Sequence, residues 1–334
     1  MATRKVILDV DTGTDDAVAI MFAALHADLE LVGVTTVNGN LPVDLTTDNT
    51  LRVLDWIGHR DIPVYPGLSR AIARPGRLDA IHAWRDSPGD GHGSTLPIPA
   101  TDLAPQDVTA VEYLVQTLRS TTERLTLVAV GPLSNVATAS TLAPSLVDAV
   151  DELVVMGGSH AIANVTASAE FNIWADPEAA SVVFSAGFER LTLVPLDATH
   201  QAQLSRADCA EFESLGTPAG IAAARFIGRR IDAAEATTQT PATPVHDVMC
   251  PAYLVRPEVI TTRQLHVEVE TASPLTEGRT VMDLRPDTTA EPNAHVALGA
   301  DRSVLVNLLL STFADSAYAA ITTNAQPARP NPTI

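Results

Sequence analysis

Carboxylate side chains gather near the N-terminus of this chain. Four aspartates fall within eight residues, directly after the apolar run Val6-Ile7-Leu8; they are Asp9, Asp11, Asp15 and Asp16. No lysine or arginine occurs between Lys5 and Arg52, so nothing local relieves the repulsion among these side chains. A hard divalent cation such as Ca²⁺ or Mg²⁺, bound by oxygen ligands, would relieve it.

The same segment also fits an ordinary helix start, with Asp15 as a cap and the other acids solvated in a loop. An acid near the positive N-terminal end of a helix gains ~0.3–1 kcal/mol, which does not offset the crowding of four carboxylates. An EF-hand is excluded, because the twelfth position counted from Asp9 is Ile20 rather than a bidentate acid. This segment alone leaves the metal site and the helix cap both open.

The elements around the aspartates explain how they are positioned. Residues 5–20, KVILDVDTGTDDAVAI, predict a buried strand, a tight turn and the first turn of a helix. The pattern of Leu29–Thr36 predicts a second buried strand, which ends just before Asn38 and Asn40. Because open α/β sheets bind ligands at the carboxyl ends of their strands, we expect Asn40 to lie near the aspartates.

The whole chain alternates strand and helix patterns, which predicts one α/β domain over residues 1–320 with a mostly parallel, doubly wound, Rossmann-like sheet. We expect the active site at the C-terminal ends of the strands, and residues 321–334 to form a flexible tail. Further strands are predicted at Ile62–Tyr65, Leu125–Val130, Glu152–Met156 and Leu191–Leu196. Helices are predicted at Val43–Ile57, Val108–Arg119, 135–143, 178–186, 206–235 and Ser303–Ala319. Residues 66–105 and 157–176 lack periodicity and are expected to be irregular, and residues 248–296 are expected to be β-rich.

Composition narrows the classes of partner. The formal charge of −19 argues against a nucleic-acid polymer or an anionic membrane surface. Apolar residues make up 46% of the 334 residues, without an uninterrupted run of membrane length, which indicates a soluble globular protein. Two cysteines give no disulfide framework, and no secretory signal is visible, so a cytoplasmic location is expected.

Polar side chains at the predicted strand ends and loops are mostly carboxylates and carboxamides, with one well-placed imidazole; they are Asp9, Asp11, Asp15, Asp16, Asn40, Asn164, Glu170, Asn172, His246 and Asp247. Neither a phosphate-binding glycine loop nor a dinucleotide fingerprint is present. Carboxylates and amides that converge with a hard metal suit the vicinal hydroxyls of a sugar. A water on such a metal, beside an aspartate, suits hydrolysis.

These motifs resemble those of the inosine–uridine-preferring nucleoside hydrolase family along nearly the whole chain. The resemblance is carried, in order, by LDVDTGTDDAVAI, TTVNGN, LVAVGPLSNVA, VVMGGS, AEFNIWADPEAA, DATHQA and VHD. It implies a calcium-dependent enzyme that splits ribonucleosides into free base and ribose, acting as a homodimer or homotetramer.

The resemblance also implies roles for single residues. Asp11 corresponds to a metal ligand and general base, Asp16 and Asp247 to the other metal-binding carboxylates, and Val130 to a backbone carbonyl on calcium. His246 corresponds to the acid that protonates the departing base. The groups that hold the ribose correspond to Asp15, Asn40, Met156, Asn164, Glu170 and Asn172.

Two departures from the family pattern leave the base preference open. The family has a His-Gly element in its first long loop, where this chain has Ser87-Pro88, and His82 or His92 would have to substitute. Relatives place aromatic residues in the helix and loop that precede His246, where this chain has only Phe226 as a candidate for contact with the base. Asp9 is expected to orient its neighbours from behind the site.

Two other functions fit part of the pattern. An apolar strand that runs into Asp9-Val10-Asp11 resembles a haloacid dehalogenase-type phosphohydrolase, but Thr12 intervenes where that family continues directly with Gly-Thr. A catalytically weak nucleoside- or ribose-binding homologue would explain the altered first loop.

Overall fold

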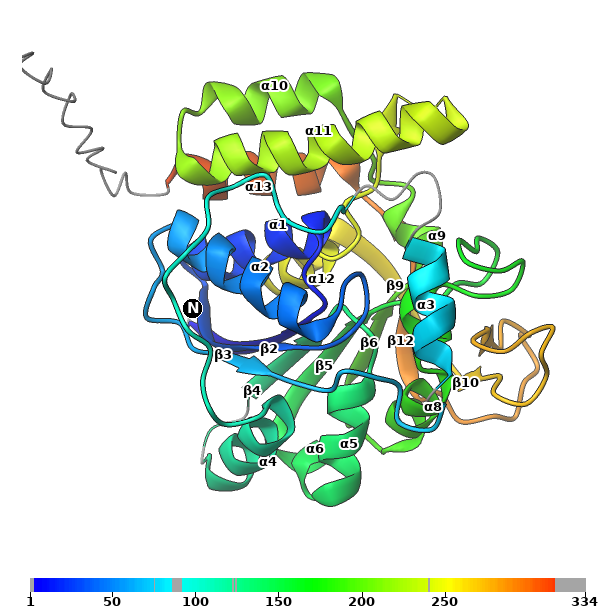
Figure 1. The fold of residues 1–334 in the computed structure, drawn as a ribbon. Helices are drawn as coiled ribbons and strands as arrows, with labels where there is room; N and C mark the ends of the chain where they lie inside the picture. The colour runs from blue at the N-terminus through cyan, green and yellow to red at the C-terminus, as the bar shows by residue number, and fades with distance from the viewer. Residues whose placement is uncertain are drawn as a thin grey trace, which may run out of the picture.

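An eight-stranded sheet forms the centre of the molecule, in the order β3-β2-β1-β4-β5-β6-β12-β9 (Figure 1). The computed structural model describes residues 3–74, 76–85, 92–121, 123, 125–239 and 241–315. The strands of this sheet are β1 (Arg4–Val10), β2 (Leu29–Thr36), β3 (Val64–Pro66), β4 (Leu125–Ala129), β5 (Val150–Met156), β6 (Leu191–Val194), β9 (Ile260–Leu265) and β12 (Ala294–Ala300). Neighbouring strands are parallel except for β12 and β9, which confirms the predicted mostly parallel α/β domain.

The strand order reverses next to β1. The chain runs outward from β1 to β2 and β3, then returns to place β4 on the other side of β1 and continues to β5 and β6. Connections that leave in opposite directions open a crevice at the carboxyl ends of the two central strands, where ligands bind in open α/β sheets. Here those ends are Val10 of β1 and Ala129 of β4.

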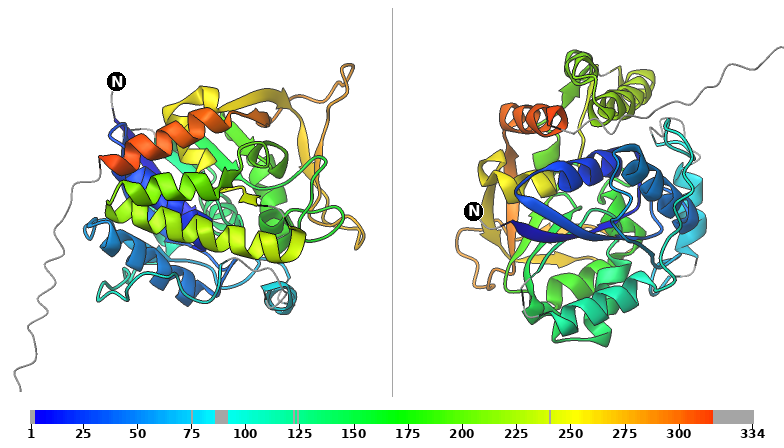
Figure 2. Two further views of the ribbon diagram at one scale, coloured as in Figure 1. Left: turned by 90° about the horizontal axis from the view of Figure 1, so that it is seen from above. Right: turned by 90° about the vertical axis from the view of Figure 1, so that its left-hand side faces the viewer.

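Helices cover both faces of the sheet, and three C-terminal helices add an outer layer on one side (Figures 1 and 2). On that side lie α1 (Thr14–Leu25), α2 (Val43–Trp56) and α12 (Met249–Val255), with α10 (Arg206–Ser214), α11 (Pro218–Thr238) and α13 (Arg302–Ala314) outside them. On the other side lie α4 (Ala110–Ser120), α5 (Ser134–Leu142), α6 (Leu146–Ala149) and α8 (Pro177–Ser185). The remaining helices are α3 (Arg77–Arg85), α7 (Phe171–Ala175), α9 (Leu196–Thr199) and the 3-10 turn Pro257–Val259. Two small two-stranded sheets complete the described fold. One pairs β7 (Leu204–Ser205) with β8 (Ala242–Thr243), and the other pairs β10 (Val267–Val269) with β11 (Thr280–Met282). Within the described residues, every helix is too short or too polar to cross a membrane.

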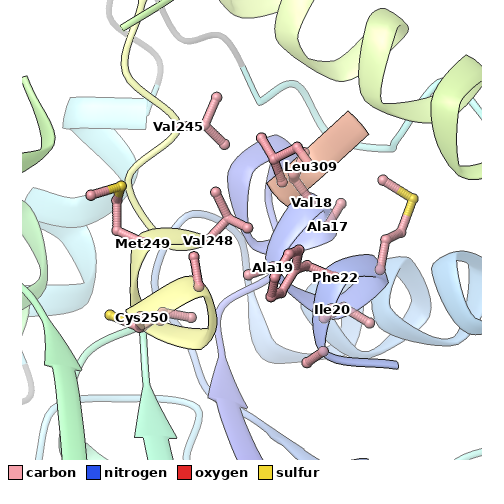
Figure 3. Close-up of a cluster of buried hydrophobic side chains, with 14 of the residues drawn as sticks. Ala17, Val18, Ala19, Ile20, Phe22, Val245, Val248, Met249, Cys250 and Leu309 are labelled. Atoms are coloured by element: carbon pink, nitrogen blue, oxygen red, sulfur yellow. The ribbon is translucent and has the colours of Figure 1, made fainter. Parts of the chain in front are cut away.

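Apolar packing fixes α1 against α12. Both helices are buried in one hydrophobic cluster with α13, part of which is drawn in Figure 3. Its members from α1 include Ala17, Val18, Ala19, Ile20 and Phe22, and its members from α12, α13 and the residue before α12 include Val248, Met249, Cys250 and Leu309. Since α1 begins directly after Gly13 and α12 directly after Val248, this packing brings the first turns of the two helices together. Burial of this kind contributes about 25 cal/mol per Å² of apolar surface, so the cluster holds the two chain segments firmly.

Three regions differ from the sequence-based expectation. The segment 66–105 contains helix α3, because Ile81 can pack against a small cluster that includes Phe171 and Trp174. The segment 157–176 contains α7, which begins because the Glu170 side chain accepts hydrogen bonds from the backbone N–H groups of the first turn. The expectation of a β-rich segment after residue 247 is wrong at its start, where α12 forms as one side of the buried cluster.

Boundaries also differ where turns interrupt a pattern. The predicted helix 206–235 is two helices, since Gly216 adopts a φ of +67° and Thr217 caps the start of α11. The closing helix α13 ends at Ala314, and residues 316–319 of its predicted range lie outside the described residues. The predicted tail 321–334 also lies outside them, so the division at residue 320 stays a prediction.

Candidate active site

The reversal point of the sheet gathers backbone ends from three strands. Val130, directly after β4, donates its N–H to the Asp9 carbonyl at 2.9 Å, and Val37, directly after β2, donates to the Val10 carbonyl at 2.9 Å. Asp11 and Asn40 therefore emerge side by side above the sheet. Asn40 donates its backbone N–H to Asp11 Oδ2 at 2.5 Å. Gly39 makes this approach possible, because a Cβ there would lie 1.9 Å from Asp11 Oδ2.

Asp16 organises the turn between β1 and α1. Its Oδ1 accepts the N–H of Asp11 at 3.1 Å, and its Oδ2 accepts the N–H of Gly13 at 2.9 Å and the Nδ2 of Asn40 at 3.2 Å. The carboxylate thus satisfies the free backbone donors at the start of the helix and ties β1 to the segment after β2. A helix-start role and a place in the site are therefore combined in one residue.

Three buried carboxylates face one another above this turn. Oxygen atoms of Asp15, Asp16 and Asp247 lie within 4.8 Å of one another. Asp11 Oδ1, also buried, has no hydrogen-bond partner among the described residues. Carboxylate oxygens at these separations are the donor set that a hard divalent cation prefers, so the residues fit such an ion.

The proton affinities of these side chains reflect their crowding. Burial, reinforced by the charge of neighbouring aspartates, raises the pKa values of Asp11 and Asp247 well above their ordinary range. The same causes raise the pKa of Asp16 to about 6. A bound cation would lower all three, because it stabilises the ionised forms.

Asp15 differs from the other acids because cationic groups face it. Burial raises its pKa, but the charge of Arg230, with smaller effects of the nearby imidazoles of His92 and His246, outweighs burial, and the pKa lies below its ordinary value. Arg230 Nη1 lies 3.1 Å from Asp15 Oδ1 as an ion pair without aligned hydrogen-bond geometry, and His92 Nδ1 lies 3.6 Å from the same oxygen. Thr14 N–H lies 3.2 Å from His92 Nδ1, which connects the first long loop to the start of α1.

His246 precedes Asp247 in the chain and lies near the acidic cluster, close enough to Asp15 for the two groups to influence each other's pKa. Its Nδ1 is 2.7 Å from the Thr199 hydroxyl, and its ring centroid is 5.6 Å from that of His200. Burial, assisted by the charge of Arg230, lowers the pKa of His246 to about 3, so the ring is neutral at pH 7. If Thr199 donates to Nδ1, the ring proton is on Nε2.

The segment after β5 supplies a second wall. Asn172 donates from Nδ2 to the carbonyl of Val130 at 2.8 Å and to that of Met156 at 3.2 Å. Both Glu170 oxygens accept backbone N–H groups, from Asn172 at 2.9 Å and from Gly158 at 2.8 Å, while burial raises the pKa of Glu170 to about 7. Asn164 lies in the same loop but is exposed, so it is not part of this group of buried residues.

Other residues named from the sequence lie behind the site or away from it. Asp9 accepts from Thr35 Oγ1 at 2.6 Å and from Asn135 Nδ2 at 2.8 Å, and burial raises its pKa to about 6. Phe226 is fully buried in the main core, which favours a packing role over contact with a base. His82 falls on α3, but its side chain and the whole of Ser87-Pro88 lie outside the described residues.

Three residues near the site are missing from the sequence-based set. Arg230 carries the charge beside Asp15, Thr199 contacts His246, and Asn135 holds Asp9 and the Thr36 carbonyl, the latter at 2.9 Å. Thr199 and Asn135 do stand in two of the motifs that carry the family resemblance, DATHQA and LVAVGPLSNVA. Nothing in the local pattern around Arg230 distinguishes it from the neighbouring Arg229, so only the fold reveals its position.

Residues 6–307 match the family described as inosine-uridine preferring nucleoside hydrolase. The chain belongs to this family. Two relatives within it are pyrimidine-specific ribonucleoside hydrolases: RihA of Shewanella baltica, 36% identical with 93% of this chain and 96% of that protein covered, and RihB of Escherichia coli O157:H7, 40% identical with 85% and 88% covered. The resemblance found in the sequence is thereby confirmed.

A solved structure supports the same assignment for this nucleoside hydrolase family member. The purine-preferring ribonucleoside hydrolase of Gardnerella vaginalis superposes with a TM-score of 0.82 at 31% identity, covering 94% of this chain and 99% of that one. Relatives with pyrimidine and purine preferences thus share the fold, so family membership does not select the base.

Proposed function

We propose that this protein hydrolyses the N-glycosidic bond of ribonucleosides to a free nucleobase and ribose. The observation that carries the proposal is the group of buried carboxylates at the reversal point of the sheet, in a chain that belongs to the nucleoside hydrolase family. The printed names of its relatives, pyrimidine-specific and purine-preferring ribonucleoside hydrolases, are consistent with this reaction.

The proposal includes one calcium ion. Asp16 and Asp247 would hold it, together with Asp11 and the backbone carbonyl of Val130, and Asp15 supplies a further nearby carboxylate. When bound, a divalent ion of this kind neutralises the acidic cluster and lowers the pKa of an attached water. The buried, unpartnered Asp11 Oδ1 supports a role for that oxygen toward the ion or the water.

Each step at the substrate has a candidate residue. As the bond from C1′ to the base nitrogen lengthens, positive charge develops on the ribose ring, and the surrounding carboxylates stabilise it. Asp11 accepts a proton from the attacking water. His246 is assigned as the acid. Because its ring is neutral, Nε2 can give its proton to the departing base only as Nδ1 takes one up, and the Thr199 hydroxyl 2.7 Å away is the group that would pass that proton to Nδ1.

The ribose is expected to lie between the aspartates and the wall after β5. We assign its hydroxyl contacts to Asp15, Asn40, Asn164, Glu170 and Asn172, with Met156 beneath the ring. Asn40 and Asn172 are already fixed by hydrogen bonds to Asp16 and to backbone carbonyls, so little rotamer freedom remains to be lost when substrate binds.

The phosphohydrolase alternative is not favoured, because the family that matches this chain and the relatives named above are nucleoside hydrolases. A measurement of ribose release distinguishes the proposed hydrolase from a catalytically weak binding homologue, which would release little or none. We also propose a cytoplasmic location, for which the two free cysteines are suited, and a homodimer or homotetramer as the family resemblance implies.

A substrate panel tests the central proposal. Release of reducing sugar from inosine, adenosine, guanosine, uridine and cytidine is measured with p-nitrophenyl phosphate as the control for phosphatase activity. We expect ribose from at least one nucleoside, abolition after chelation and recovery with Ca²⁺. Phosphate release without ribose release would overturn the proposal, and undiminished turnover in metal-free protein would remove the calcium.

A further inference from the structure

Helix α11 sends one arginine side chain into the candidate active site. Arg230 is 13% exposed, and its Nη1 lies 3.1 Å from Asp15 Oδ1 and 3.3 Å from His92 Nε2. Its Nε–H is buried without a hydrogen-bond partner among the described residues. A guanidinium has five N–H donors in a planar fork, so these contacts leave donors that a ligand can use.

The charge of Arg230 reaches the histidine side of the site. Burial is the largest cause of the lowered pKa of His246, and the charge of Arg230 lowers it further. The charge of Arg230 also adds to burial in lowering the pKa of His200. A single fixed cation that contacts Asp15 therefore also lies within electrostatic reach of the rings of His200 and His246.

An arginine so near the metal-binding carboxylates needs a reason. Like charge repels a divalent cation, and the ion pair with Asp15 competes with that residue for the ion. If the only role of Arg230 were to hold the Asp15 carboxylate in place, a neutral hydrogen-bond donor could do so without repelling the cation. A positive charge is useful here if negative charge develops nearby during the reaction.

We propose that Arg230 is a further catalytic residue, which binds the departing nucleobase and stabilises the negative charge that the base acquires as its bond to C1′ breaks. This inference rests on the proposed nucleoside hydrolysis. It assigns the base subsite to the space between Arg230, His200 and His246.

The reaction then balances as follows. Water adds its oxygen to C1′ and gives one proton to Asp11, while the C1′–N bond breaks with its electron pair passing to the base nitrogen. In uracil or hypoxanthine that charge spreads to the carbonyl oxygens, which accept hydrogen bonds from the Arg230 guanidinium. The base anion then takes one proton from His246, His246 regains one proton from solvent, and Asp11 gives its proton to solvent, so that the protein returns to its starting protonation state.

The test varies the charge on the leaving base while the sugar stays the same. Inosine is compared with 7-methylinosine, whose cationic base departs neutral, and uridine with 5-fluorouridine, whose base is a more stable anion. The variants are Arg230→Met and Arg230→Lys, with Arg229→Met as the matched control. Arg229 is the adjacent residue of α11, and its Nη1 donates to the Thr95 carbonyl at 3.3 Å instead of facing Asp15.

We expect Arg230→Met to lower kcat/KM by about 100-fold on inosine or uridine, the size of effect found for one preorganised donor to a developing anion. The loss on 7-methylinosine is expected to be less than about fivefold, and that on 5-fluorouridine smaller than on uridine. Arg230→Lys should recover part of the activity, and Arg229→Met should leave all ratios unchanged. Melting temperature and calcium affinity, measured on each variant, report whether the fold and the acidic cluster are intact.

Equal losses on both members of each pair would overturn the proposal, since Arg230 would then act only by positioning Asp15. A change confined to calcium affinity would overturn it as well. Failure of the proposed function is a distinct result, because the wild-type protein would then release ribose from none of these nucleosides.

Discussion

Asp247→Asn tests whether the three facing carboxylates form an ion site. Two unit charges 4.8 Å apart repel by about 3.5 kcal/mol at an effective dielectric constant of 20. Part of this repulsion is avoided in the metal-free protein, because the raised pKa of Asp247 favours its protonated form. About 1–2 kcal/mol of repulsion therefore remains to be relieved, which corresponds to a rise in melting temperature of about 1.5–3 °C for a chain of this size.

The same substitution should have the opposite effect on the metal-bound protein. A carboxylate that interacts with the ion by about 3 kcal/mol corresponds to a loss of about 100-fold in calcium affinity, at 1.4 kcal/mol per factor of ten. The assay is a calcium titration by calorimetry, with thermal melting in chelator and in excess Ca²⁺.

The matched control is Asp9→Asn. Asp9 is also a buried aspartate at the end of β1, but Thr35 and Asn135 hold it and it is not one of the three facing carboxylates. We expect its replacement to change calcium affinity by less than about fivefold. Calcium affinity of Asp247→Asn within about threefold of wild type, or a lower melting temperature in chelator, would refute the reasoning.

Three further predictions concern the reaction and its pH dependence. Asp11→Asn should lower ribose release by at least about 100-fold with little change in melting temperature, measured by reducing-sugar assay, whereas a binding homologue would be at background in both forms. His246→Ala should slow inosine far more than p-nitrophenyl riboside, and equal losses would remove it as the acid. The rise in melting temperature caused by Ca²⁺ should grow from pH 5 to pH 8. The pKa of Asp16 is raised to about 6, so the metal-free fold loses stability as pH rises through that value, whereas calcium binds the ionised form of this ligand. A calcium effect that is constant across these pH values would contradict the third prediction.

The sequence was sufficient for the parts of the fold that repeat. Buried parallel strands appear as short apolar runs, so β2 was predicted with the bounds that the structure has, and β1 and β5 to within a few residues. Short helices without a long periodic pattern were missed. Helix α7 depends on capping by Glu170, and α12 on burial against α1, and both causes lie in tertiary contacts.

For the site, the sequence by itself determined which residue types are available and which strand ends carry them. Asp11, Asp16 and Asn40 are placed by the ends of neighbouring strands, which a sheet must bring to one edge, and hydrogen bonds do join them. Tertiary structure alone decided that Asp247, more than 200 residues away in the chain, lies within 4.8 Å of Asp15 and Asp16. It also decided that Arg230 rather than Arg229 faces Asp15, because the orientation of α11 is set by core packing around Phe226 and the rest of its buried face. Local patterns carry no information about either contact, since both depend on how separately formed helices pack against one another.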